Sequence, residues 1–201
     1  MSMHLNMPIY LVDDDAAFAD SLIYLMESFG YLLRWFDSGQ TFLSEVNLCQ
    51  PGCVILDSRM PELSGQQVLQ KLNQVNSPLS VIFLTGHGDV PMAVDALKNG
   101  AFDFFQKPIK GKALAYSIEK SLERTKICAL HGQQQALINN LTQRELEIFR
   151  LITQGKTNKQ IAESLFLAIR TIEVHRARLM QKLNVASMAE LMSMASLMPN
   201  S

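Results

Sequence analysis

The sequence lacks the features of a membrane or secreted protein. No apolar run in its 201 residues approaches the ~18 residues that a membrane span needs. Residues 1–8 contain no basic segment that leads into an apolar stretch, so we expect no signal peptide. Cysteine is sparse and odd in number, with three residues, which argues against a disulfide framework. These absences predict a cytoplasmic protein with no membrane partner.

The chain also has little net charge, but its charges are unevenly distributed. Hydrophobic residues make up 48% and charged residues 18%, which excludes a disordered chain, a collagen and a simple coiled coil. Residues 1–124 hold 14 acidic and 9 basic side chains, a sum of −5, and residues 125–201 hold 5 acidic and 9 basic ones, a sum of +4. An acidic front and a basic back predict two modules with different partners, and nucleic acid is a candidate for the second.

The front of the chain alternates short apolar runs with amphipathic stretches. The predicted strands are Ile9–Val12, Leu32–Phe36, Cys53–Asp57, Ser80–Thr85 and Phe102–Gln106. The predicted helices cover residues 16–29, 41–46, 66–72, 91–98 and 110–130. This alternation is typical of an α/β fold, here a doubly wound, five-stranded parallel sheet with helices on both faces.

The back of the chain is helical throughout and predicts a small four-helix, all-α domain. Thr142-Gln-Arg-Glu145 and Thr157-Asn-Lys-Gln160 are capping boxes, and Gly155 ends the first helix. Later helices are expected over residues 170–183 and 188–197, with Met188, Met192 and Ala195 of the last one in the core. We therefore divide the chain into a domain over residues 1–125, a polar linker over 126–140 that is loose or helical, and a domain over 141–201.

Acidic side chains follow the predicted strands where parallel strands place ligand sites. Asp13, Asp14 and Asp57 lie at two strand ends, Thr85 ends a third strand and Lys107 follows a fourth. Clustered carboxylates repel one another unless a cation offsets them, and hard oxygen ligands favour Mg²⁺. A lysine and a hydroxyl beside them suit a phosphoryl group. The pattern predicts a Mg²⁺-assisted phosphoryl site with Asp57 as nucleophile.

A purely structural interpretation of each residue is available. An Asp after a strand commonly caps the next helix, and we expect this role for Asp15. Lys107 alone could be a solvated charge. The placement of such residues at four strand ends favours a shared site.

Four stretches carry a resemblance to the receiver domain of two-component response regulators. They are Val12-Asp-Asp-Asp15, Leu56-Asp-Ser-Arg-Met-Pro61, Leu84-Thr-Gly-His-Gly-Asp89 and Phe104-Phe-Gln-Lys-Pro108, and the resemblance covers about residues 8–125. It implies that a sensor histidine kinase phosphorylates Asp57.

The same resemblance implies the roles of the surrounding residues. Mg²⁺ would be bound by Asp13, Asp14, Asp57 and the Arg59 carbonyl. Lys107 and Thr85 would contact the phosphoryl oxygens, Phe104 would turn inward with Thr85, and the Lys107–Pro108 bond would be cis.

The third helix of the basic module has one apolar and one mixed face. At ~100° per residue, Leu179 and Leu183 fall within about 20° of Ile172 and form the core side. Glu173, Val174, Ala177, Arg178 and Gln181 lie on the opposite half, a mixture that suits a DNA major groove. Asn158 and Lys159 on the preceding helix are placed to meet phosphates. From charge alone, a helical interaction module with a solvated basic face is an equal alternative.

Three further stretches resemble the LuxR-type, or NarL/FixJ-type, helix-turn-helix over about residues 137–199. They are Leu141–Glu145, Gly155–Ala162 and Arg170–Arg176. At the position of Ala168 the family usually has a Ser, which caps the recognition helix and contacts a phosphate. Alanine cannot cap a helix. Thr171, together with Arg170 and Lys159, would then make the phosphate contacts. Within the family the chain resembles the FixJ-type branch, and in it the tetrathionate-respiration regulators.

The sequence thus predicts a transcription factor switched by phosphorylation rather than an enzyme, with at most a slow self-dephosphorylation of phospho-Asp57. Its expected partners are a cognate sensor kinase, promoter DNA, RNA polymerase and a second copy of the chain. A Mg²⁺ phosphatase using the same carboxylates is one alternative. A regulator or interaction module that works without phosphorylation is another.

Overall fold

The computed structural model describes residues 7–86 and 90–198 and divides the chain into two compact units, Met1–Ala129 and Leu130–Ser201. Residues His87–Asp89, the end of the third receiver-like stretch, lie outside the described residues. The boundary between the units falls within the segment that the sequence marks as a linker.

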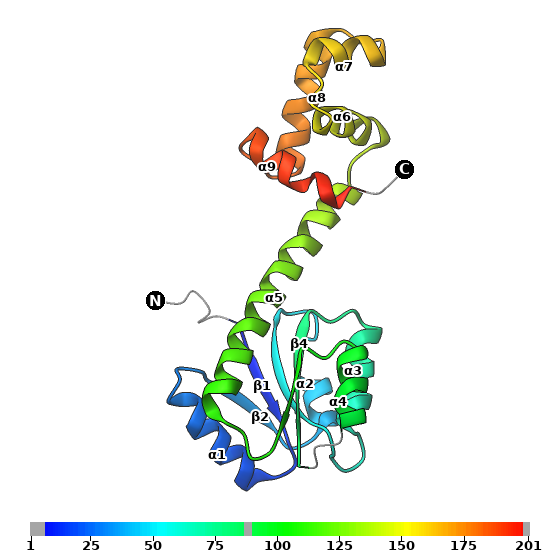
Figure 1. Cartoon of the computed structure of the whole chain (residues 1–201). Coiled ribbons are helices and arrows are strands. Elements are labelled where there is room, and N and C mark those ends of the chain that lie inside the picture. Colours follow the sequence, from blue (N-terminus) through cyan, green and yellow to red (C-terminus); the bar gives the residue numbers. More distant parts are fainter. Residues whose placement is uncertain (1–6, 87–89, 199–201) are drawn as a thin grey trace. The chain divides into compact units, whose positions relative to one another are not determined.

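The first unit is built on a five-stranded parallel sheet, as predicted (Figure 1). Its strands are β1 (Ile9–Val12), β2 (Leu33–Phe36), β3 (Gly52–Asp57), β4 (Leu79–Thr85) and β5 (Asp103–Gln106). They lie in the order β2-β1-β3-β4-β5, and every neighbouring pair is parallel. All five predicted strands are confirmed with bounds within one residue.

Helices cover both faces of this sheet, which is why its central strands are predominantly apolar. The helices are α1 (Ala16–Glu27), α2 (Gly39–Glu45), α3 (Gly65–Gln74), α4 (Val90–Lys98) and α5 (Gly111–Asn139). One core packs α1 and α5 against the sheet through residues such as Leu22 and Ile118. The other packs α2, α3 and α4 through residues such as Phe42, Leu69 and Ala96. Figure 1 shows the two layers on opposite sides of the sheet.

Helix α5 continues through the linker segment. The sequence placed the end of the helix near Leu130 and left the linker as loose or helical, and the structure shows the helical alternative, with α5 reaching Asn139. Nothing in residues 126–139 stops a helix, because the segment has no proline and Gly132 alone costs only about 1 kcal/mol. Ile118 on this helix is buried in the first unit, and Ile138 is buried in the core of the second.

The second unit is all helical, as predicted. It contains α6 (Gln143–Thr153), α7 (Asn158–Leu165), α8 (Ile169–Lys182), α9 (Met188–Ser193) and a 3-10 turn over Met194–Leu197. Both predicted capping boxes form, with Thr142 and Thr157 as the N-caps. Gly155 ends α6 with a φ of 77°, a left-handed conformation that glycine adopts without strain.

The core of the second unit confirms one apolar pattern and corrects another. Ile172 of α8 is fully buried on the predicted core face, together with Leu179 and Leu183. The expectation for the last helix was wrong, because Met188 and Met192 are 38% and 40% exposed. Leu191 and Met194 are buried instead. Helix α9 has apolar side chains on more than one face, so spacing alone could not select the inner one.

Candidate functional site

Three charged side chains meet at the carboxyl edge of the sheet. Val12 of β1 pairs with Leu56 of β3, so the residues that follow them, Asp13 and Asp57, lie side by side. Lys107 follows β5 and reaches both: its Nζ lies 2.6 Å from Asp13 Oδ2 and 3.0 Å from Asp57 Oδ1. The structure therefore places three of the residues expected at the site in one cluster.

Burial and ion pairing have opposite effects on the pKa values of this cluster. The Asp13 side chain is only 1% exposed, and this burial raises its pKa more than the Lys107 hydrogen bond lowers it. For Lys107, burial lowers the pKa, but the hydrogen bonds and charges of Asp13 and Asp57 outweigh burial and raise it overall. The lysine is thus held in its charged form, as the cation that offsets two buried carboxylates.

Backbone and ring groups fix Asp13 and Asp57 in place. The Arg59 N–H donates to Asp57 Oδ2 at 2.8 Å, and the Asp15 N–H donates to Asp13 Oδ1 at 3.1 Å. The Trp35 indole N–H donates to the Asp13 carbonyl oxygen at 2.9 Å. These bonds orient the acidic groups from three separate segments.

The remaining residues expected at the pocket differ in exposure. Asp14 and the Arg59 side chain are exposed, Thr85 is fully buried at the end of β4, and Phe104 of β5 is half-buried against the core. Asp15 caps α1 by accepting the Phe18 N–H, which confirms the role expected for it. The Lys107–Pro108 peptide bond is cis, as expected.

The donor set at this edge fits a hard cation that keeps part of its water shell. Among residues 7–86 and 90–198, no group of three or more His, Cys, Asp or Glu side chains is arranged to hold a metal ion. Mg²⁺ does not require one, because it is usually bound by one or two carboxylates together with waters. The Asp13 and Asp57 carboxylates, adjacent at the sheet edge beside exposed Asp14, offer hard oxygen ligands of this kind.

Three contributors to the pocket were not found from the sequence. The Phe18 ring lies under Lys107, with Nζ 3.9 Å from the ring centroid. Gly65 begins α3 so close to β3 that a Cβ there would collide with the Asp57 carbonyl oxygen. Ser58 is buried, and within the described ranges its Oγ has no hydrogen-bond partner. Each depends on contacts across the fold that no local pattern encodes.

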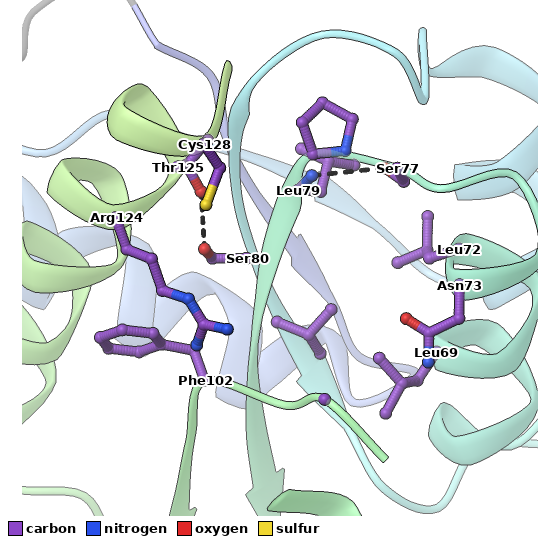
Figure 2. A pocket seen from close by; sticks show the side chains of 13 residues that line it. Leu69, Leu72, Asn73, Ser77, Leu79, Ser80, Phe102, Arg124, Thr125 and Cys128 are labelled. Atoms are coloured by element: carbon purple, nitrogen blue, oxygen red, sulfur yellow. Dashed lines mark hydrogen bonds between the residues drawn. The ribbon is translucent and has the colours of Figure 1, made fainter. Parts of the chain in front are cut away.

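A cavity of about 160 Å³ lies at the opposite, amino edge of the sheet (Figure 2). Ser80 of β4 bonds Thr125 of α5 across it, at 2.6 Å between the two hydroxyl oxygens. Arg124 lies over the Phe102 ring, and Asn73 donates to the Asn99 carbonyl oxygen at 2.8 Å. These polar groups serve contacts within the fold and are separate from the carboxylate cluster.

In the second unit the expected DNA-facing residues share one side of α8. The outward residues of α8 are all exposed: Arg170, Glu173, Val174, Ala177 and Arg178. Lys159 of α7 is exposed, and Asn158 and Thr171 are half-buried. Ala168 is the N-cap of α8 and makes no side-chain capping bond, as its identity predicted.

The fold and these two groups of residues define the class: a receiver domain joined to a helix-turn-helix module. Comparison with protein families agrees. The response regulator receiver domain matches residues 9–119, and the bacterial regulatory proteins of the luxR family match residues 139–195. The chain belongs to the response regulators with a LuxR-type DNA-binding domain, the NarL/FixJ family, and is a phosphorylation-dependent transcription regulator.

Relatives of known name match nearly the whole chain. The tetrathionate response regulatory protein TtrR of Salmonella typhimurium is 44% identical over 91% of this chain and 89% of its own. The transcriptional regulatory protein FixJ of Azorhizobium caulinodans is 39% identical over 96% and 93%. Among solved structures, the response regulator StyR is 38% identical with a TM-score of 0.72, covering 94% of this chain and 98% of its own. Full-length FixJ from B. japonicum is 37% identical with a TM-score of 0.58, covering 96% and 97%.

No helix within the part of the chain that the structure describes is long and apolar enough to cross a bilayer.

Proposed function

We propose that Asp57 is the phosphoacceptor of this regulator. A carboxylate oxygen of Asp57 bonds to phosphorus while the bond from phosphorus to a histidine nitrogen of a cognate sensor kinase breaks. The observation that carries this proposal is the contact of Lys107 Nζ with both Asp57 and Asp13, at 3.0 and 2.6 Å. Lys107 is already placed to pair with the charge that a phosphoryl group brings to Asp57.

Asp13, Asp14, Asp57 and the Arg59 carbonyl would hold Mg²⁺ at this edge. When bound, the ion neutralises charge on the phosphoryl oxygens. The chain's own groups do the rest: Lys107 binds a phosphoryl oxygen, and the Arg59 N–H keeps Asp57 oriented. The turnover we assign is slow self-dephosphorylation of phospho-Asp57, because the two units that the structure describes match a receiver domain and a DNA-binding domain.

Phosphorylation switches the α4–β5 face of the receiver. About two negative charges are added at Asp57, and Lys107, Thr85 and Phe104 rearrange around them. Val94 and Leu97 of α4 are exposed apolar side chains on this face, which suits pairing with a second receiver. The resulting homodimer brings two α8 helices to promoter DNA, where the regulator meets RNA polymerase in the cytoplasm.

The 44% identity to the Salmonella regulator favours tetrathionate as the signal of this pathway. The sensor kinase, and not this chain, would bind the anion. Tetrathionate should induce a reporter in a host that carries this regulator and its cognate sensor kinase. A reporter that responds to another signal and not to tetrathionate would remove this assignment.

Phosphorylation and association can be tested together on the full chain. Wild type incubated with a small phosphodonor and Mg²⁺ should gain one acid-labile phosphoryl group in the intact mass, and Asp57→Asn should gain none. Asp20→Asn, a change on the exposed side of α1, is the matched control and should behave as wild type. Phosphorylation of Asp57→Asn at the wild-type rate would show that another residue is the acceptor.

Beryllofluoride with Mg²⁺, a phosphoryl mimic, should shift wild type from monomer toward dimer in sedimentation and strengthen its DNA binding. Asp57→Asn should show neither change. Equal DNA affinity with and without the mimic would favour the regulator that works without phosphorylation.

A further inference from the structure

The turn between α7 and α8 carries an exposed aromatic residue. Phe166 is 95% exposed, the highest value of any large apolar side chain among the described residues. Its neighbours Leu165 and Leu167 pack against the core of the second unit, so only Phe166 points away from it. An isolated exposed apolar residue is ordinary. An aromatic ring that is almost fully exposed to water, however, contributes nothing to the core.

The backbone of the same residue is also unfavourable. Phe166 has φ 55° and ψ 43°, the left-handed conformation, which side chains with a Cβ adopt only at a cost. Glycine or asparagine usually occupies such a helix end. The Phe166 ring therefore adds no stability to the fold, and its backbone conformation lowers it. Local choices that oppose the fold without compensation concentrate at functional sites.

Phe166 lies in the turn that leads into the amino-terminal end of α8. It is three residues before Ile169, the first residue of α8, where Ile169 and Arg170 are both exposed, and the last turn of α7 beside it carries exposed Glu163. The amino-terminal end of a recognition helix is the part that reaches base edges in the major groove. The thymine C5-methyl is the apolar group displayed there, and phenylalanine is among the side chains that contact it.

We infer that Phe166 is a specificity-determining residue that packs its ring against a thymine methyl of the DNA site. This inference rests on the DNA-binding function of the second unit. It extends the reading surface beyond the outward face of α8 to the turn before it. The left-handed conformation of the α7–α8 turn is then the one that directs the Phe166 ring into the major groove.

The test uses the full chain activated with beryllofluoride and a site selected from random DNA by the wild type. Each thymine of the site is replaced in turn by uracil, which lacks only the C5-methyl. At one position per half-site, uracil should weaken wild-type binding about fivefold and leave Phe166→Gly unaffected. Thymines whose methyl groups contact Val174 should remain sensitive to replacement by uracil in Phe166→Gly. These positions are identified as the ones where Val174→Ala loses its sensitivity to uracil.

Two further readouts separate a DNA contact from a structural role. The salt dependence of Phe166→Gly should equal that of wild type, because the ring carries no charge. Hydrogen exchange of the α7–α8 amides should be no faster in Phe166→Gly than in wild type. Met192→Ala, which truncates an exposed apolar side chain of α9, should keep wild-type affinity at every thymine.

Identical uracil profiles for wild type and Phe166→Gly would overturn the inference and leave a protein partner as the explanation of the exposed ring. Faster exchange in Phe166→Gly would overturn it in favour of a structural role. If the wild type itself selects no DNA sequence, the DNA-binding function fails, and this inference fails with it.

Discussion

Lys182, in the last turn of α8, donates to Glu145 near the start of α6, with 2.8 Å between Nζ and Oε2. The same oxygen accepts the N–H and the hydroxyl of Thr142, each at 2.9 Å. Burial of Glu145, whose side chain is 7% exposed, raises its pKa, but the bonds from Lys182 and Thr142 outweigh burial and lower it overall. One carboxylate thus caps α6 and ties it to the recognition helix.

Low pH should therefore lower the free energy of unfolding of the second unit, because Glu145 becomes protonated. A carboxyl whose folded pKa lies below its ordinary value of 4.5 stabilises the fold above that pH and loses the contribution as pH falls through the folded pKa. Glu145→Gln should lower the free energy of unfolding by about 1 kcal/mol at neutral pH and flatten its decline below about pH 4.5. Urea unfolding across pH, with hydrogen exchange assigning the change to α6, measures both effects.

Glu147→Gln is the control for this prediction. Glu147 pairs with Arg144 but is 48% exposed, so its loss should cost no more than a few tenths of a kcal/mol. An unchanged pH dependence in Glu145→Gln would contradict the role assigned to that carboxylate.

Ser58→Ala should stabilise the receiver. The Ser58 Oγ is buried with no partner within the described ranges, and such a group costs about 1–3 kcal/mol. Its removal should raise the free energy of unfolding by about 1 kcal/mol in urea titrations. Ser117→Ala provides the contrast, because Ser117 is equally buried but donates to Asp103 at 2.7 Å, and its loss should destabilise. Equal losses in both variants would show that the Ser58 hydroxyl is satisfied.

Ala168→Ser should stabilise α8 by supplying the missing N-cap. Ala168 has φ −72° and ψ 146°, the extended geometry in which a serine oxygen reaches the N–H groups of the first turn. We expect a gain of about 0.5–2 kcal/mol, seen as slower hydrogen exchange at the start of α8. Ala177→Ser, within the same helix, should instead cost a few tenths of a kcal/mol. A gain of equal size in both variants would exclude capping as the cause.

The exposed face of α8 and the basic residue of α7 should contribute to DNA binding in different ways. Glu173→Ala and Val174→Ala should relax the preference at one or two base pairs and lose about 1–3 kcal/mol per good contact. Lys159→Ala should weaken all sequences alike and reduce the salt slope by about one. Selection from random DNA, followed by binding at several salt concentrations, separates the two classes. Recovery of the wild-type motif by both α8 variants would place the reading face elsewhere.

The parts of the fold that follow from local patterns were predictable from the sequence. Buried parallel strands are short apolar runs, so β1 to β5 were located within one residue. Capping boxes such as Thr142-Gln-Arg-Glu145 mark helix starts by direct hydrogen bonds, and both formed. The meeting of Asp13, Asp57 and Lys107 also followed, because the carboxyl ends of parallel strands share one edge.

What could not be predicted depends on contacts between distant residues. The Glu145–Lys182 pair spans two helices, and Phe18 reaches Lys107 from another segment of the chain. Met188 and Met192 belong to a helix with apolar residues on several faces, so only packing decides which of them are buried. Phe166 sits in a conformation that propensity argues against, and no rule of local structure would assign it there.

The chain has a single tryptophan, and it is Trp35, whose indole N–H donates to the Asp13 carbonyl oxygen. Its fluorescence therefore comes from one ring, hydrogen-bonded to the residue that Lys107 contacts. Any event that moves Asp13 alters the environment of this ring and, with it, the emission. The unlabelled chain carries its own optical reporter of the acidic pocket, suited to stopped-flow measurement of how fast that pocket responds.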